Sequence, residues 1–163
     1  VHTLRAECDA VLTGGNTVRL DNPSLTIRKP DRPVSPLKEQ PWRIILTHNA
    51  SSIPADSICL TDEFRDRTLV VENVFSYLEL LKKLYNDKKI GTILLEAGGC
   101  LVREFLKAGL VDEWVGFYAP IIIGGGADGV APGPFLEHEA HLEQPVVNIF
   151  GDDVCIRGDI CYR

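Results

Sequence analysis

The stretch Ile93-Leu94-Leu95-Glu96-Ala97-Gly98-Gly99-Cys100-Leu101-Val102-Arg103-Glu104-Phe105 says most about the fold. An apolar run with a β-branched residue leads into a glycine pair, and apolar residues then recur at helical spacing. The pattern predicts a strand over Thr92–Glu96 and a helix over Cys100–Ala108, ended by Gly109. Helix amides and the helix dipole suit a phosphate, and glycine lets a ligand approach closely. A tight turn without a ligand explains the pattern equally well, since neither the dinucleotide fingerprint nor the Walker motif is matched.

Strand and helix patterns alternate along the rest of the chain and end with two strands. This order predicts an α/β fold with a mostly parallel central sheet, flanking helices and a C-terminal antiparallel hairpin. The expected helices are the helix end Val1–Cys8 and the amphipathic Val74–Asn86. The expected strands are Asp9–Thr13, Arg43–Thr47, Ser57–Leu60, Thr68–Val71 and Asp112–Pro120, with a hairpin of Val146–Phe150 and Val154–Cys161 around Gly151-Asp152-Asp153.

Composition restricts the class of protein. The 163 residues are 45% hydrophobic and 25% charged, which predicts one globular domain. A net charge of −6 argues against nucleic acid as a partner but allows a small phosphorylated ligand in a locally basic site. No apolar run is long enough to cross a membrane. Five cysteines without a C-x-x-C pair predict reduced thiols in the cytoplasm.

A second glycine pair, Gly14-Gly15, follows the first predicted strand and precedes three candidate ligand contacts. Thr17 can donate to a phosphate or ribose, Asp21 can accept from a hydroxyl or carboxamide, and Arg28 has the fork that grips phosphate. On local chemistry alone, a solvated loop with turn hydrogen bonds from Asp21 before Pro23 is the better interpretation.

Several separated motifs, taken together, carry a family resemblance. They are Leu4–Leu12, Thr17–Arg28, Leu95–Gly99, Ala108–Glu113, Ala119-Pro120 and Gly124-Gly125. In this order the chain resembles the reductase half of the bacterial bifunctional riboflavin-biosynthesis deaminase–reductase. The resemblance implies a dihydrofolate-reductase-like fold and NADPH-dependent reduction of the ribosyl group of 5-amino-6-(5-phosphoribosylamino)uracil to a ribityl chain.

The same resemblance implies roles for individual residues. The arginines of the substrate set would lie near the 5′-phosphate, and Glu96 would be the catalytic proton handler or, alternatively, only a substrate hydrogen-bond partner. The implied cofactor contacts are Thr17, Asp21, Gly98, Gly99, Cys100, Leu101, Val102, Arg103 and Glu104. The implied substrate contacts are Arg5, Leu25, Arg28 and Glu96.

The resemblance further implies a homodimer and allows a deaminase domain upstream of this chain. No zinc deaminase signature occurs within the chain, so the chain itself is expected to hold no deaminase. The family's opening strand precedes Val1. We therefore expect residues 1–163 to be a single reductase domain that lacks this strand, keeps the phosphate-binding half of the site and does not turn over alone. No metal is expected, and His138 and His141 are read as part of a solvated acidic loop. Two alternatives stay open: a same-fold reductase acting on a pterin or other carbonyl compound, and a non-catalytic nucleotide-binding module.

Overall fold

The computed structural model describes residues 1–28, 39–122, 129–134, 136 and 138–163. Within this part of the chain two compact units form, Val1–Gly98 and Gly99–Arg163. The boundary falls inside the predicted glycine turn, between Gly98 and Gly99.

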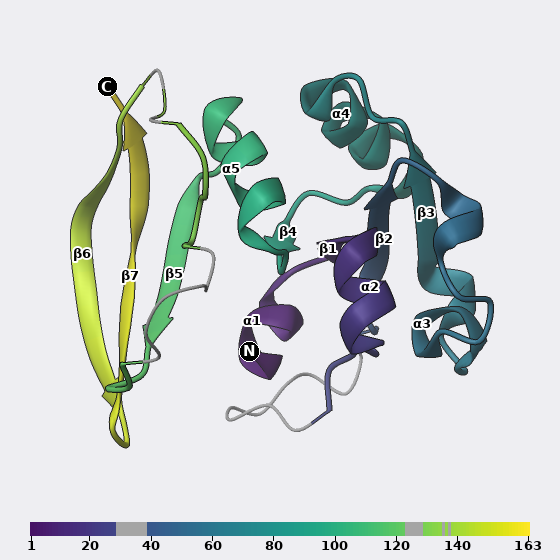
Figure 1. Cartoon of the computed structure of the whole chain (residues 1–163), viewed down its shortest axis with the longest axis horizontal. Helices are drawn as coiled ribbons and strands as arrows, with labels where there is room; N and C mark the ends of the chain where they lie inside the picture. The colour runs from purple at the N-terminus through teal and green to yellow at the C-terminus, as the bar shows by residue number, and fades with distance from the viewer. Residues whose placement is uncertain (29–38, 123–128, 135, 137) are drawn as a thin grey trace. The chain divides into compact units, whose positions relative to one another are not determined.

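A four-stranded parallel sheet organises the first unit (Figure 1). Its order is β3-β2-β1-β4, formed by β1 (Ala10–Gly14), β2 (Trp42–Thr47), β3 (Thr68–Glu72) and β4 (Ile93–Leu95). The central strands β1 and β2 are buried almost throughout, as expected of a parallel sheet whose two faces are both covered. All four strands agree with the sequence prediction to within two residues.

Four α-helices belong to this unit: α1 (His2–Glu7), α2 (Gly15–Asp21), α3 (Ile58–Thr61) and α4 (Tyr77–Lys88). Two single turns of 3₁₀ helix, η1 (Ala50–Ser52) and η2 (Arg65–Arg67), complete it. The predicted amphipathic helix is confirmed as α4, which begins where the Ser76 side chain accepts from the Glu79 amide and ends at Lys89 in the left-handed conformation.

Two local predictions were wrong. The expected strand Ser57–Leu60 is the short helix α3, because the Asn22 side chain accepts from the Ile58 amide at 2.8 Å and thereby caps the first turn. The segment after Gly14-Gly15 is not a loop but begins as α2, in which Gly15 and Val18 are buried.

The second unit contains helix α5 (Gly99–Lys107) and a three-stranded antiparallel sheet of order β5-β7-β6. Gly109 follows α5 with φ +65°, so it ends the helix as predicted. The predicted hairpin is confirmed as β6 (Ala140–Phe150) and β7 (Asp153–Tyr162), and β5 (Glu113–Tyr118) adds the third strand on the other side of β7.

His141 lies in β6 rather than in the expected loop, and its Nε2 is 2.8 Å from a carboxylate oxygen of Glu139. Glu137 and Gly124 to Gly126 lie outside the described residues. No cluster of three or more potential metal-ligating side chains occurs in the part of the chain that the structure covers.

None of the helices in the described ranges is long and apolar enough to cross a membrane. Cys59, Cys100, Cys155 and Cys161 are free thiols.

Candidate functional site

The parallel sheet of the first unit has a topological switch point between β1 and β4. The chain passes from β1 to β2 and β3 on one side and returns to β4 on the other side of β1. In such sheets, ligands bind where the strand order reverses, beyond the carboxyl ends of the strands. Gly14 and Glu96 stand at these ends, and the Glu96 amide extends the pairing by donating to Leu12 O at 3.0 Å. This edge is therefore the candidate site.

A buried ion pair marks the site. The Arg5 guanidinium from α1 donates through Nε to Oε1 of Glu96 and through its NH2 group to Oε2, each at 2.7 Å. Arg5 is 8% exposed, so this fork-to-fork pair is formed largely away from water, where charge-assisted hydrogen bonds are strong. A third bond runs from the Arg5 NH1 group to Thr26 O at 2.9 Å. Two residues that the resemblance assigned to the substrate, Arg5 and Glu96, are thus in direct contact.

Leu25 has an unusual backbone conformation. Its φ is +54° and its side chain is 2% exposed. A β-carbon in the left-handed region costs about 1–2 kcal/mol, so neighbouring contacts must hold the residue there. Such strain occurs most often where the chain contacts ligands.

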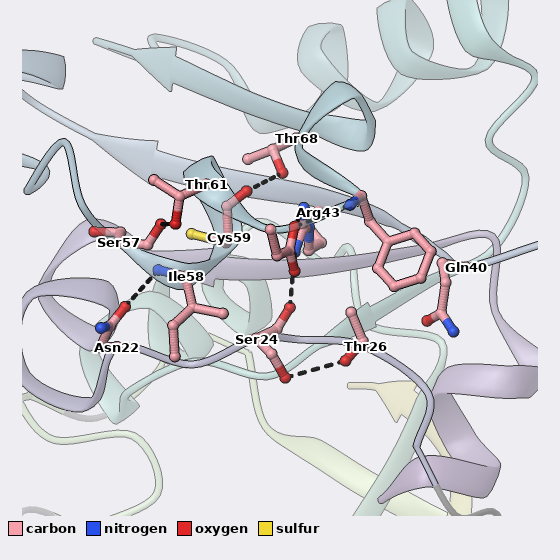
Figure 2. A network of polar contacts seen from close by, with 12 residues as sticks. Asn22, Ser24, Thr26, Gln40, Arg43, Ser57, Ile58, Cys59, Thr61 and Thr68 are labelled. Atoms are coloured by element: carbon pink, nitrogen blue, oxygen red, sulfur yellow. Dashed lines mark hydrogen bonds and ion pairs between the residues drawn. The ribbon is translucent and has the colours of Figure 1, made fainter.

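The contacts that hold Leu25 act on the residues on either side of it. Arg5 binds the carbonyl of Thr26, and Arg43 from β2 donates to the carbonyl of Ser24 at 3.1 Å, as Figure 2 shows. Arg43 is in turn held by Asp62, the C-cap residue of α3, through two bonds of 2.7 and 2.8 Å. The sequence analysis missed Arg43 and Asp62. An arginine inside an otherwise apolar strand was the available signal, because a charged side chain at a buried position needs a partner.

The Arg43 guanidinium lowers the pKa of Asp62, chiefly through the hydrogen bonds between them. Burial opposes this shift, and the positive charge of Arg43 and the Phe64 amide add to it. Burial raises the pKa of the neighbouring Cys59 thiol, against the effect of the Arg43 charge. Asp62 is therefore a carboxylate and Cys59 a neutral thiol at pH 7.

The remaining candidates of the first unit are more open. Thr17 and Asp21 stand four positions apart on α2, on one face of the helix, and Asp21 is exposed. Arg28 is exposed, and its amide lies 3.3 Å from His2 Nδ1, which is also 3.2 Å from Thr26 O. No role was predicted for His2 from the sequence, because only the folded position of α1 brings it near Arg28.

The glycine pair divides into two different environments. Among the described residues, a β-carbon on Gly98 would meet no atom within 4 Å, whereas one on Gly99 would lie 2.5 Å from Gly129 O and 2.6 Å from Pro132 Cδ. Open space beside Gly98 is compatible with close approach of a ligand, as predicted. The space beside Gly99 is filled by its own chain, so the lack of a side chain there serves packing within the second unit.

The first turns of α5 hold the other predicted cofactor contacts. Cys100 and Glu104 are exposed, and Leu101 and Arg103 are half-buried. Val102 is buried with Phe105 and Leu106 in the second unit, so its side chain serves the core and only its backbone is available to a ligand. A β-carbon on Gly133 would lie 3.0 Å from Arg103 Nε, which places this guanidinium against the Gly133 backbone.

A parallel sheet with charged side chains gathered at the carboxyl edge of its switch point is the arrangement expected of an α/β protein with a small-ligand site at that edge. The chain belongs to the family of RibD C-terminal domains, whose model matches residues 1–156.

Individual relatives agree with this assignment. The riboflavin biosynthesis protein RibD of Mycobacterium tuberculosis is 35% identical over 125 residues, which cover 77% of this chain and 34% of that protein. The 2,5-diamino-6-ribosylamino-4(3H)-pyrimidinone 5′-phosphate reductase of Aquifex aeolicus is 32% identical over 144 residues, which cover 77% of this chain and 62% of the relative. The chain thus spans about a third of the length of the first relative.

Among solved structures, RibD of Acinetobacter baumannii superimposes with a TM-score of 0.84 at 25% identity, covering 98% of this chain and 49% of that one. This structural neighbour confirms the fold class and the dihydrofolate-reductase-like architecture predicted from the sequence.

Proposed function

We propose that the protein catalyses NADPH-dependent reduction of the ribosyl group of a 5-phosphoribosylamino-pyrimidine to the ribitylamino product, a step of riboflavin biosynthesis. The observation that carries the proposal is the RibD C-terminal domain match over residues 1–156. The printed name of the Aquifex aeolicus relative, a ribosylaminopyrimidinone 5′-phosphate reductase, supports the same reaction class.

The cofactor proposal rests on the open space at Gly98 and on the shared face of Thr17 and Asp21. We propose that Thr17 and Asp21 contact the nicotinamide nucleotide, and that Gly98 with the first turn of α5, Gly99 to Glu104, holds its phosphates. NADPH held by these residues would supply the hydride that reduces C1′ of the ribosyl group. We also propose that the protein prefers NADPH to NADH.

The substrate roles follow from charge and position. Arg28 is exposed at the end of the Leu25 segment, and its guanidinium suits the 5′-phosphate. The bonds to Glu96 and Thr26 use three of the five donor groups of Arg5, which leaves this guanidinium donors for a phosphate as well. Glu96 accepts from Arg5 with both oxygens and has further lone pairs for a substrate donor, so we assign it substrate hydrogen bonding ahead of proton transfer.

Two substrates fit this chemistry and differ only in the pyrimidine. One is 5-amino-6-(5-phosphoribosylamino)uracil, and the other is the pyrimidinone named for the relative. Initial rates of NADPH oxidation by the complete gene product with each compound, with the dephosphorylated nucleosides and with dihydrofolate test the assignment. We expect turnover only with phosphorylated ribosylaminopyrimidines. Oxidation with dihydrofolate would favour the pterin reductase, and NADPH binding without any turnover would favour the non-catalytic module.

Assembly and location complete the proposal. We propose that residues 1–163 act as one reductase domain, that a deaminase domain accompanies it in the complete gene product, and that the protein is a homodimer. Free thiols at Cys59, Cys100, Cys155 and Cys161 support a cytoplasmic location, which we propose for the protein.

A further inference from the structure

The segment from Asn22 to Ile27 is held by side chains rather than by a neighbouring strand. Asn22 Oδ1 accepts from the Ile58 amide at 2.8 Å, and the Gln40 amide group bonds both the N–H and the carbonyl of Ile27, at 2.7 and 3.1 Å. Between these two anchors lies Leu25, buried and at positive φ. The conformation of this segment therefore depends on the side chains that reach it.

Two arginine–carboxylate pairs hold the middle of the segment. Arg5, paired with Glu96, binds the carbonyl that follows Leu25, and Arg43, paired with Asp62, binds the carbonyl that precedes it. Each pair uses two parallel bonds of 2.7–2.8 Å. The first pair belongs to the candidate site. The second pair joins Arg43 of β2, the strand on the opposite side of β1 from β4, to Asp62 at the end of α3.

Stability alone gives a weak reason for a charged side chain at position 43. Arg43 is 0% exposed, and its Nε is a buried donor without a hydrogen-bond partner in the described part of the chain. Removing a guanidinium from water is costly, and an apolar side chain of similar volume often stabilises a core as well or better. What an apolar side chain could not do is hold the Ser24 carbonyl in a fixed direction.

We propose that Arg43 is a positioning residue, held by Asp62, that fixes Leu25 and the following residues in the conformation that contacts the substrate. Figure 2 shows Arg43 beside Ser24, whose carbonyl it binds. This inference rests on the proposed function, in which Leu25 and Arg28 contact the phosphorylated substrate. Asp62 acts only through Arg43, because it orients the guanidinium and has no bond of its own to the Asn22–Ile27 segment among the contacts of the described residues.

The test uses Arg43→Gln, Asp62→Asn and the double variant, with Val70→Ala as a control. Val70 packs against the buried cluster of Val18, Ile45, Ile53 and Cys59, so this variant destabilises the same unit without removing a contact to the Ser24 carbonyl. Amide hydrogen exchange of residues 22–28 measures the segment directly. Substrate and NADPH affinities, with KM and kcat for the complete gene product, measure the consequence.

We expect Arg43→Gln to speed exchange in residues 22–28 and to weaken substrate binding, each by about tenfold, the effect of losing one charge-assisted bond. KM should rise while kcat and NADPH affinity stay near wild type. Asp62→Asn should have a smaller effect in the same direction, and the double variant should equal Arg43→Gln, because Asp62 has no separate route to the segment. Val70→Ala should lower stability without changing exchange in residues 22–28 beyond the rest of the unit.

Unchanged exchange in residues 22–28 of folded Asp62→Asn and Arg43→Gln would overturn the proposal. So would faster exchange without any loss of substrate affinity. Because Arg43→Gln removes a buried charge and can fail to fold, Asp62→Asn at the rim of the pair is the decisive single variant. The exchange readout needs no substrate, so a wild-type protein that binds neither NADPH nor substrate would contradict the proposed function while leaving the positioning role measurable.

Discussion

At the scale of single residues, substitutions of the two glycines of the turn should affect different properties, NADPH affinity at Gly98 and stability at Gly99. A methyl group on Gly98 meets no atom of the described residues within 4 Å, so Gly98→Ala should fold normally. It should lose NADPH affinity by about tenfold or more if phosphates approach it, since overpacking costs about 1–3 kcal/mol. Gly99→Ala should instead lower the free energy of unfolding by about that amount, through contact with Gly129 O and Pro132. Thermal denaturation and NADPH titration of both variants separate the two effects. Equal NADPH affinity in folded Gly98→Ala would remove this glycine from the phosphate site.

A second residue-scale prediction concerns Arg28. If its guanidinium grips the 5′-phosphate, Arg28→Lys should raise KM about tenfold or more, because lysine lacks the bidentate fork and a charge-assisted bond is worth about 1.5–3 kcal/mol. The dephosphorylated nucleoside provides the control, since its poor binding should not change with this substitution. An unchanged KM for the phosphorylated substrate would exclude Arg28 from the site.

At the scale of elements, the contact between β2 and the end of α3 predicts a pH dependence of stability. Because the pKa of Asp62 is lowered in the folded state, its carboxylate stabilises the fold above its unfolded pKa of about 3.9, and this stabilisation is lost as pH falls through the folded value. Cys59 stays neutral throughout this range, because burial raises the pKa of its thiol. Asp62→Asn should therefore cost about 2 kcal/mol at pH 7, and the difference from wild type should shrink below about pH 4. Urea unfolding at several pH values measures it, and a difference independent of pH would contradict the charged pair.

Most elements could be predicted from the sequence because their signals are local. Local sequence alone indicates these elements, through the apolar runs of β1, β2, β3 and β4 and the periodicity of α4 and α5. The helix α3 could not be predicted in this way, since a short apolar run fits strand or helix, and its first turn is capped by Asn22, 36 residues away in the sequence. The start of α2 was missed because a glycine pair is typical of a break.

Some residues of the candidate site could be predicted from the sequence, and others could not. Arg5, Leu25, Arg28 and Glu96 were reached through family motifs, whose order along the chain is visible in the sequence. Arg43 and Asp62 could not be reached in this way. The hydrogen bonds that indicate their role join Arg43 to Ser24 and to Asp62, each 19 positions away in the sequence. The positive φ of Leu25 also leaves no mark in the sequence, since leucine gives no sign of the left-handed conformation.

At the scale of the whole molecule, the three-stranded sheet supports the proposed homodimer. Register places Phe117, Val146 and Phe150 on one face, each about half exposed or more, and the two phenylalanine rings lie 6.1 Å apart. Light scattering after size exclusion should give twice the 18.0 kDa mass of the chain, and Phe150→Glu should shift it toward the monomer. A wild-type monomer at micromolar concentration would contradict the dimer.

In the proposed function, the phosphate of a ribosylaminopyrimidine directs the substrate to the arginine-lined edge of the first unit, where it is reduced. The most direct measurement is NADPH oxidation by the complete gene product with 5-amino-6-(5-phosphoribosylamino)uracil, compared with its dephosphorylated form. We expect turnover of the phosphorylated compound, with the ribitylamino product formed in equal amount to the NADPH consumed, and little turnover of the dephosphorylated compound. Equal turnover of both compounds, or none in a protein that binds NADPH, would contradict it.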